Sequence, residues 1–167
     1  MPDRPATVLA LIVVCLSAGA GLAADTQKAP RDPQKAPPEI SRALLNPYLK
    51  VQTALAADDL YTAQAGATEF TVAASAHRAS DTNLMMISNR ISAAPDLKTA
   101  RQAFGELSAV LIRWAGKGTG GKTIYIAFCP MVKKSWLQEG EAISNPFYGP
   151  SMPRCGEITR RPDPKLR

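Results

Sequence analysis

The chain of 167 residues contains one histidine, three cysteines and few aromatic residues. Aromatic residues make up 6% of it, so alanine and leucine must supply most of the packing in the core. That composition favours helices over a β-sandwich. No serine lies in a G-x-S-x-G sequence, and the one histidine, His77, is not near a cysteine in the sequence. We therefore do not expect a hydrolytic enzyme.

The chain is basic, with 20 lysine and arginine residues against 14 aspartate and glutamate residues and a net charge of +6. Such a charge permits an acidic partner without identifying one. No motif of a nucleic-acid-binding module accompanies it, so nucleic acid is not an expected partner. Hydrophobic residues form 46% of the chain, which is ordinary for a globular domain and excludes extended disorder for most of it.

The N-terminus has the pattern of a secretory signal peptide. Arg4 precedes an uncharged apolar run over residues 6–20, and small residues lead to a cleavage site near Ala23. The run is shorter than the about 20 apolar residues of a membrane-spanning helix. We expect residues 1–23 to be removed on export, leaving a periplasmic chain with no membrane span. The alternative is that this leader stays on as an anchor.

The rest of the chain divides into three parts. Residues 24–38 are rich in proline and poor in apolar residues, as is typical of a flexible linker. Residues 39–157 are long enough for one domain. Residues 158–167 carry four basic residues and one acidic residue and are predicted to form a solvated, frayed tail.

Four helical patterns begin the domain, because apolar residues recur there at spacings of three and four. These patterns run over about residues 39–57, 58–77, 81–93 and 95–115. Asp58 and Asp59 are predicted to cap the second helix, and Asp96 the fourth. Pro47 should kink the first helix or mark its start.

The pattern changes after the fourth helix. Residues 123–128 are β-branched and aromatic, which predicts a strand. From Cys129 onward no helical period is visible, and Trp136, Phe147 and Tyr148 are expected to pin this segment onto the helices. We predict a mainly α fold: an up-and-down bundle of three to four helices, then a short strand and an irregular C-terminal cap that contains cysteine and methionine.

Residues 116–123 match the nucleotide-binding pattern G-x-x-x-x-G-K-[ST]. A phosphate-binding loop follows a strand and opens a helix, whose N-terminus supplies the positive dipole. Here the order is reversed, because the segment follows a helix and precedes a strand. We interpret it as a linker and expect no nucleotide.

The sulfur-containing side chains near the C-terminus form two short pairs, each in a proline-containing turn. Cys129 and Met131 lie at the end of the predicted strand, and Met152 and Cys155 lie further along. If the segment between them folds back, the four sulfurs converge. Thiolates and thioethers are soft ligands that select copper(I), whereas zinc more often recruits histidine or a full set of cysteines.

Two other interpretations compete with this metal site. Cys129 and Cys155 would be the two cysteines left after export, and such pairs often form disulfides in oxidising compartments. That bond would close a loop of about 25 residues and stabilise the cap by roughly 3 kcal/mol. His77 lies on the apolar face of the second predicted helix. It is either a core residue or an additional ligand.

The C-terminal segment resembles a bacterial domain of unknown function. The resemblance lies in residues 125–131 (YIAFCPM), 143–149 (ISNPFYG) and 155–157 (CGE), with Trp136 and Met152 between them. That family occurs as a stand-alone exported protein and as a fusion to periplasmic adaptor subunits of copper and silver efflux pumps. The alanine-rich helices resemble it too, so the match covers about residues 40–157.

The resemblance implies a soft-metal site at Cys129, Met131, Met152 and Cys155 in preference to the disulfide. The family often has a histidine region between its second and third helices, and His77 lies near that place at a different spacing. We predict a periplasmic protein that buffers or delivers copper(I), linked to an efflux system or another envelope protein. The alternative is a non-metal interaction module of the envelope with a structural disulfide.

Overall fold

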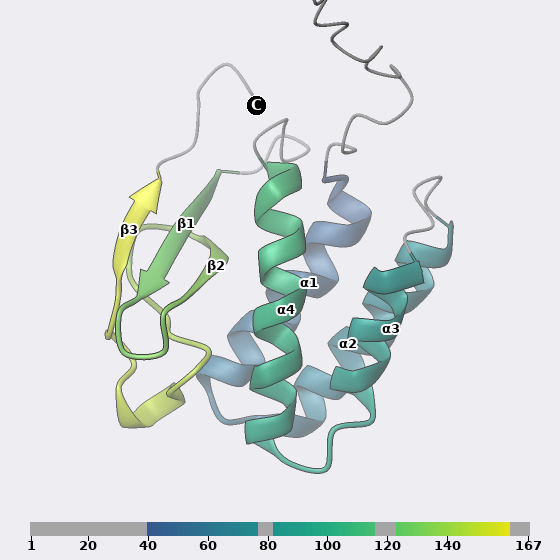
Figure 1. The fold of residues 1–167 in the computed structure, drawn as a ribbon, viewed down its shortest axis with the longest axis horizontal. Helices are drawn as coiled ribbons and strands as arrows, with labels where there is room; N and C mark the ends of the chain where they lie inside the picture. Colours follow the sequence, from purple (N-terminus) through teal and green to yellow (C-terminus); the bar gives the residue numbers. More distant parts are fainter. Residues whose placement is uncertain (1–39, 77–81, 116–122, 161–167) are drawn as a thin grey trace, which may run out of the picture. The chain divides into compact units, whose positions relative to one another are not determined.

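A computed structural model of the chain describes residues 40–76, 82–115 and 123–160 (Figure 1). The predicted signal peptide at residues 1–23 and the predicted linker at residues 24–38 lie outside the described residues. His77 and the segment 116–122 of the nucleotide-binding pattern also lie outside them.

The described residues contain four α-helices, in agreement with the predicted number. They are α1 (Arg42–Ala56), α2 (Leu60–Ala76), α3 (Thr82–Ser92) and α4 (Leu97–Ala115). Each helix packs against the next one along the chain, and α4 also contacts α1. Their apolar faces therefore meet in a common core, as the spacing of the apolar residues predicts.

Two of the predicted helix caps are confirmed. The backbone N–H of Thr62 donates to Oδ1 of Asp59 at 2.9 Å, just inside the start of α2. The backbone N–H of Thr99 donates to Oδ1 of Asp96 at 2.7 Å, at the start of α4. Each carboxylate satisfies an amide that has no partner within its own helix, which defines where the helix begins.

The structure excludes one of the two alternatives for Pro47, and it contradicts the cap predicted at Asp58. Pro47 lies inside α1 and is buried, so it does not mark the start of that helix. Its ring contributes to the core at the cost of one helical hydrogen bond. Asp58 adopts a positive φ of 59° in the turn before α2, and its carboxylate forms an ion pair with Arg101 of α4. It joins two helices and does not cap one.

The segment after α4 forms an antiparallel sheet of three strands, where an irregular cap was expected beyond the first strand. The strands are β1 (Ile124–Cys129), β2 (Lys134–Glu139) and β3 (Glu157–Arg160), in the order β2-β1-β3. A short 3-10 helix, η2 (Gly149–Ser151), precedes β3. The predicted strand is confirmed as β1, but residues 158–160 of the predicted frayed tail belong to β3, because their backbone pairs with β1.

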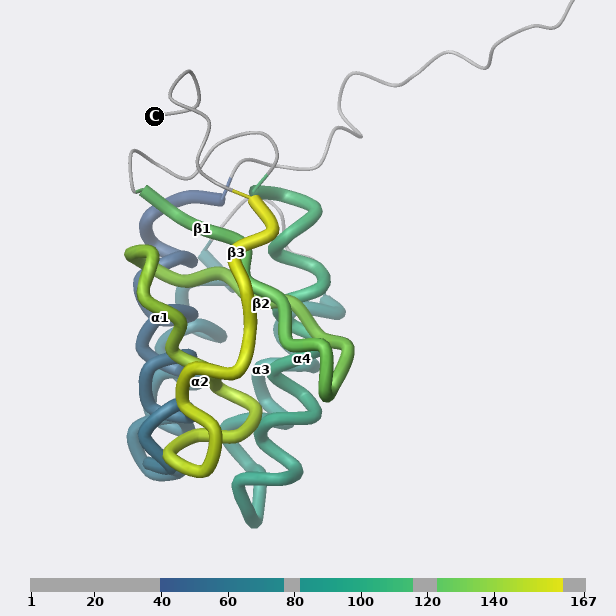
Figure 2. Tube along the Cα trace, turned by 90° about the vertical axis from the view of Figure 1, so that its left-hand side faces the viewer, coloured from purple at the N-terminus to yellow at the C-terminus, as the bar shows by residue number. Residues whose placement is uncertain are grey.

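The sheet packs against one side of the helices. Figures 1 and 2 show β2 beside α4 and α1, with α2 and α3 on the other side of these two helices.

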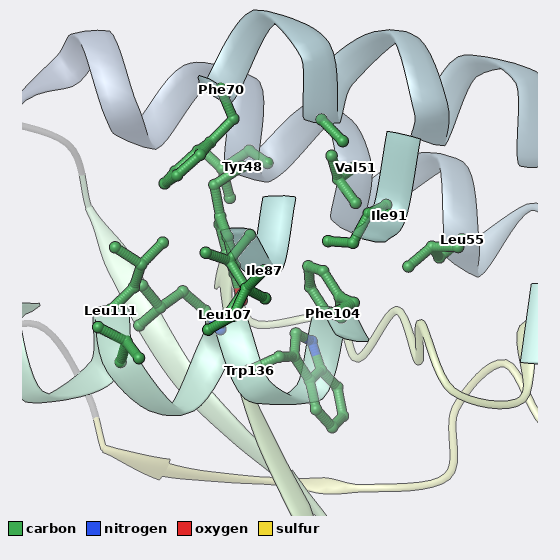
Figure 3. Packing of buried hydrophobic residues seen from close by; sticks show 14 of the residues in the cluster. Tyr48, Val51, Leu55, Phe70, Ile87, Ile91, Phe104, Leu107, Leu111 and Trp136 are labelled. Atoms are coloured by element: carbon green, nitrogen blue, oxygen red, sulfur yellow. The ribbon is translucent and has the colours of Figure 1, made fainter. Parts of the chain in front are cut away.

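Figure 3 shows Tyr48, Phe104 and Trp136 pointing into the same interior. A chain of aromatic contacts crosses it. Ring centroids lie 5.1 Å apart for Tyr48 and Phe104, 6.0 Å for Phe104 and Phe147, and 5.9 Å for Phe147 and Trp136.

The hydroxyl of Tyr48 links three elements. Tyr48 is fully buried in α1, and its oxygen lies 2.8 Å from Oγ of Ser108 in α4. It accepts a hydrogen bond of 3.0 Å from the backbone N–H of Leu137 in β2. Because β2 lies at an edge of the sheet, this bond satisfies an amide that has no partner strand. Burial raises the pKa of Tyr48 and keeps its hydroxyl protonated.

Replacing Tyr48 with phenylalanine tests this link. We expect Tyr48→Phe to lower the free energy of unfolding by about 1–3 kcal/mol, because the buried Leu137 amide loses its acceptor. Chemical denaturation followed by circular dichroism measures the change. Tyr61→Phe is the matched control, since Tyr61 is 82% exposed and should tolerate the change. Equal unfolding midpoints for the two variants would contradict the assigned role.

Candidate functional site

The two cysteines of the predicted site lie side by side. Cys129 is the last residue of β1, and Cys155 precedes β3 by two residues. Their Sγ atoms are 3.4 Å apart, and both are free thiols. Cys129 is fully buried, whereas Cys155 is half-buried. The structure therefore brings together two reactive groups that are far apart in the sequence and leaves one of them within reach of solvent.

Pairing between β1 and β3 produces this approach. Glu157 of β3 lies opposite Phe128, the residue before Cys129. Gly156, with φ of 145°, allows the chain to pass closely, because a Cβ there would lie 2.9 Å from the carbonyl oxygen of Phe128. The same Cβ would lie 3.0 Å from the ring of Trp136. A larger residue at this position would push Cys155 away from Cys129.

The buried side chain of Asn145 holds the segment that carries Cys155. Its Nδ2 donates to the carbonyl oxygen of Cys155 at 2.6 Å. Its Oδ1 accepts from the backbone N–H groups of Phe147, at 2.8 Å, and Tyr148, at 3.3 Å. Its own N–H donates to the carbonyl of Pro153 at 3.0 Å. In the sequence, Asn145 is recognisable as a turn former because it precedes a proline, but its contact with the segment of Cys155 is not.

Arg101 attaches this segment to the helices. Its Nε donates to the carbonyl oxygen of Pro146 at 2.8 Å, and its Nη2 donates to that of Leu55 at 3.0 Å. The same Nη2 pairs with the carboxylate of Asp58. Arg101 therefore joins α4, the end of α1 and the segment after β2. The residue pattern of α4 does not distinguish Arg101 from an arginine on a solvated surface. This role therefore could not be predicted from the sequence.

The surroundings of the two thiols give them different pKa values. Burial acts to raise the pKa of Cys129, but hydrogen bonds to its sulfur outweigh burial and hold the pKa below its ordinary value. The donors are the N–H of Val132, the thiol of Cys155, the side chain of Asn145 and the N–H of Met131. The hydrogen bond to Cys129 raises the pKa of Cys155, and burial and the charge on Cys129 add to it. Cys129 therefore ionises first, and the Cys155 thiol stabilises its thiolate.

The two methionines of the predicted site lie in the turns beside the cysteines. Met131 is in the turn after β1 and is 64% exposed. Met152 is half-buried at the end of η2, where its carbonyl accepts from the N–H of Cys155 at 3.2 Å. Among the described residues, no hydrogen bond joins either thioether to a thiol. In the same part of the chain, no three His, Cys, Asp or Glu side chains cluster closely enough to hold a metal ion.

Comparison with family models, curated proteins and solved structures finds no match to this chain. Within residues 40–76, 82–115 and 123–160, none of the helices combines the length and the apolar character needed to cross a membrane.

Removing the Cys155 thiol tests the origin of the low pKa of Cys129. We expect Cys155→Ala to raise the pKa of Cys129, because the thiolate loses a hydrogen-bond donor. The ultraviolet absorbance of the thiolate, followed against pH, reports the change. Cys155→Ser is the matched control, because its hydroxyl can still donate and should keep the pKa nearer that of the parent protein. Identical titrations of the two variants would contradict this account.

Proposed function

We propose that the chain binds copper(I), with the thiolates of Cys129 and Cys155 as its main ligands and the thioethers of Met131 and Met152 as further ligands. The observation that carries this proposal is the pair of free thiols, whose sulfurs lie 3.4 Å apart. Thiolates and thioethers are soft donors that suit copper(I) better than hard cations. Zinc is less suited, because its protein sites usually include histidine or more cysteines.

The separation of the thiols suits a shared ion. Two sulfur ligands of a tetrahedral ion with metal–sulfur bonds of about 2.3 Å lie about 3.8 Å apart. The observed 3.4 Å needs only a small outward movement, which the half-buried Cys155 can supply. A disulfide would instead require the two sulfurs to approach to about 2.05 Å. The sulfurs therefore need to move less for a shared ion than for a disulfide.

The pKa difference also suits a metal site. Metal ions bind thiolates, so a bound ion must displace the thiol protons. The low pKa of Cys129 reduces the free energy needed to form the first thiolate. The raised pKa of Cys155 comes mainly from its hydrogen bond to Cys129. A bound ion would replace that hydrogen bond, and its positive charge would favour the thiolate of Cys155.

The exposure of Met131 supports a role for the thioethers. Large apolar side chains in the described residues are mostly buried, but Met131 is 64% exposed in the turn whose amides bond to Cys129. Met152 lies three residues before Cys155 and is hydrogen-bonded to it through the backbone. Each thioether is thus attached to the same turn as one thiol. The proposal requires the flexible methionine side chains to turn toward the ion.

The biological setting that we propose is export, followed by buffering or delivery of copper(I) in the periplasm. The apolar segment at residues 6–20 supports export. The resemblance of the C-terminal segment to a domain fused to metal-efflux adaptors supports a link to efflux and a partner in the cell envelope.

The second candidate is an interaction module without metal, in which a disulfide between Cys129 and Cys155 stabilises the sheet. The same closeness of the two sulfurs favours it. The disulfide would join the end of β1 to the segment before β3 and would remove both thiols from metal chemistry.

A thiol assay and a metal titration separate these two candidates. Protein purified from the exported compartment should contain two reactive thiols and bind one copper(I) tightly in the presence of a competing chelator. The reason is that two adjacent thiolates form a chelate for a soft ion. An assay that finds no free thiols and no copper binding would contradict the metal proposal and support the disulfide.

Replacement of the methionines tests the further ligands. Met131→Leu and Met152→Leu should each weaken copper(I) binding while changing the free energy of unfolding by less than about 0.5 kcal/mol, as is usual for surface positions. Competitive chelator titration and chemical denaturation measure the two quantities. Met86→Leu is the matched control, because Met86 is 61% exposed on α3, away from the sheet. Unchanged affinity in both site variants would show that the thioethers are not ligands.

A further inference from the structure

A cavity of about 320 Å³ lies between α4, the turn joining β1 to β2, the start of β2 and the segment after β2. Its walls are Lys98, Arg101, Gln102, Val132, Lys134 and Phe147. Three of these six side chains are cationic and none is acidic. This basic pocket is therefore distinct in chemistry from the thiol pair, although Val132 belongs to the turn that bonds to Cys129.

The positive charge of the basic pocket is only partly balanced. Arg101 pairs with Asp58. In the part of the chain that the structure describes, no carboxylate forms an ion pair with Lys134. Lys98 forms no ion pair there either, although its charge interacts with that of Asp96. Arg101 uses Nε and Nη2 for its bonds to the helices and to the segment after β2. Nη1 of Arg101 takes part in none of these bonds.

Lys134 is held in the basic pocket by its neighbours. Its Nζ lies 5.6 Å from the centroid of the Phe147 ring, which is a cation–π distance. Its stem crosses α4 at Gly105, where a Cβ would lie 2.6 Å from Nζ and 2.8 Å from Cδ. Gly105 therefore leaves room on α4 for the end of the lysine side chain.

A half-buried ammonium without a carboxylate favours the binding of an anion. Lys134 is partly shielded from water, so its charge is screened less than that of a fully exposed lysine. Lys98 and Arg101 add positive charge from one face of α4, because residues three apart are neighbours on a helix. Phe147 and Val132 add apolar wall to the same cavity.

We propose that the basic pocket binds a small polyvalent anion that carries carboxylate or phosphate groups. Lys98, Lys134 and Nη1 of Arg101 contact the anionic oxygens, Gln102 donates a further hydrogen bond, and Phe147 and Val132 contact the body of the ligand. Binding requires no metal ion, so this proposal stands or fails independently of the copper site.

Calorimetric titration of the full chain at low salt, without copper, tests the proposal. Citrate and inorganic pyrophosphate are the two probes. We expect saturable binding at one site, which weakens as sodium chloride is added because the contacts are ionic. Binding of citrate alone assigns carboxylate ligands, binding of pyrophosphate alone assigns phosphate ligands, and binding of both assigns recognition by charge.

Three variants locate the binding. Lys134→Gln and Lys98→Gln should each weaken binding about tenfold, the loss expected for one charged hydrogen bond. Arg113→Gln is the matched control, because it removes the same charge from an exposed position near the other end of α4. Lys98 is also exposed, so its variant should fold normally even if the Lys134 variant does not.

Loss of affinity in either lysine variant beyond that in the Arg113 variant supports the proposal. The absence of saturable heat with both probes would overturn it. An equal loss in all three variants would also overturn it, because binding would then depend on the net charge of the chain and not on the basic pocket.

Discussion

The hydrogen bonds of the Tyr48 hydroxyl are the interaction on which the rest of the architecture depends. They join α1 to α4 through Ser108, and they join both helices to the edge strand β2 through Leu137. Once β2 is attached to the helices, its pairing places β1, and β1 in turn places β3. The stacked rings of Tyr48 and Phe104 fill the space around this bond and exclude water from it.

Buried polar side chains, and not an apolar core of its own, hold the segment between β2 and β3. Gln138 donates to the carbonyls of Gly140 and Ala142, while Asn145 binds the backbone further along. Arg101 attaches the same segment to α4. These bonds satisfy backbone groups that no strand or helix pairs. They also determine reactivity, because Asn145 both places Cys155 and lowers the pKa of Cys129.

The helices were predictable, whereas two strands were not. Apolar spacing and the capping carboxylates of Asp59 and Asp96 act within one or two turns, so the sequence carries them directly. In β2, Trp136, Leu137 and Gln138 are all buried, which removes the alternation that normally reveals a strand. Residues of β3 are mostly exposed, and they form a strand because β1 offers them a backbone partner. The pairing with β1 cannot be inferred from the residues of β3 alone.

The residues that carry sulfur, and their grouping into two short pairs along the chain, are evident from the sequence. The distance of 3.4 Å between the sulfurs of Cys129 and Cys155, and the lower pKa of Cys129, follow from the fold. The reason is that a pKa depends on donors and burial contributed by distant residues, such as Asn145. The same holds for the surroundings of Lys134, because Phe147 and Gly105 lie beside it from other parts of the chain.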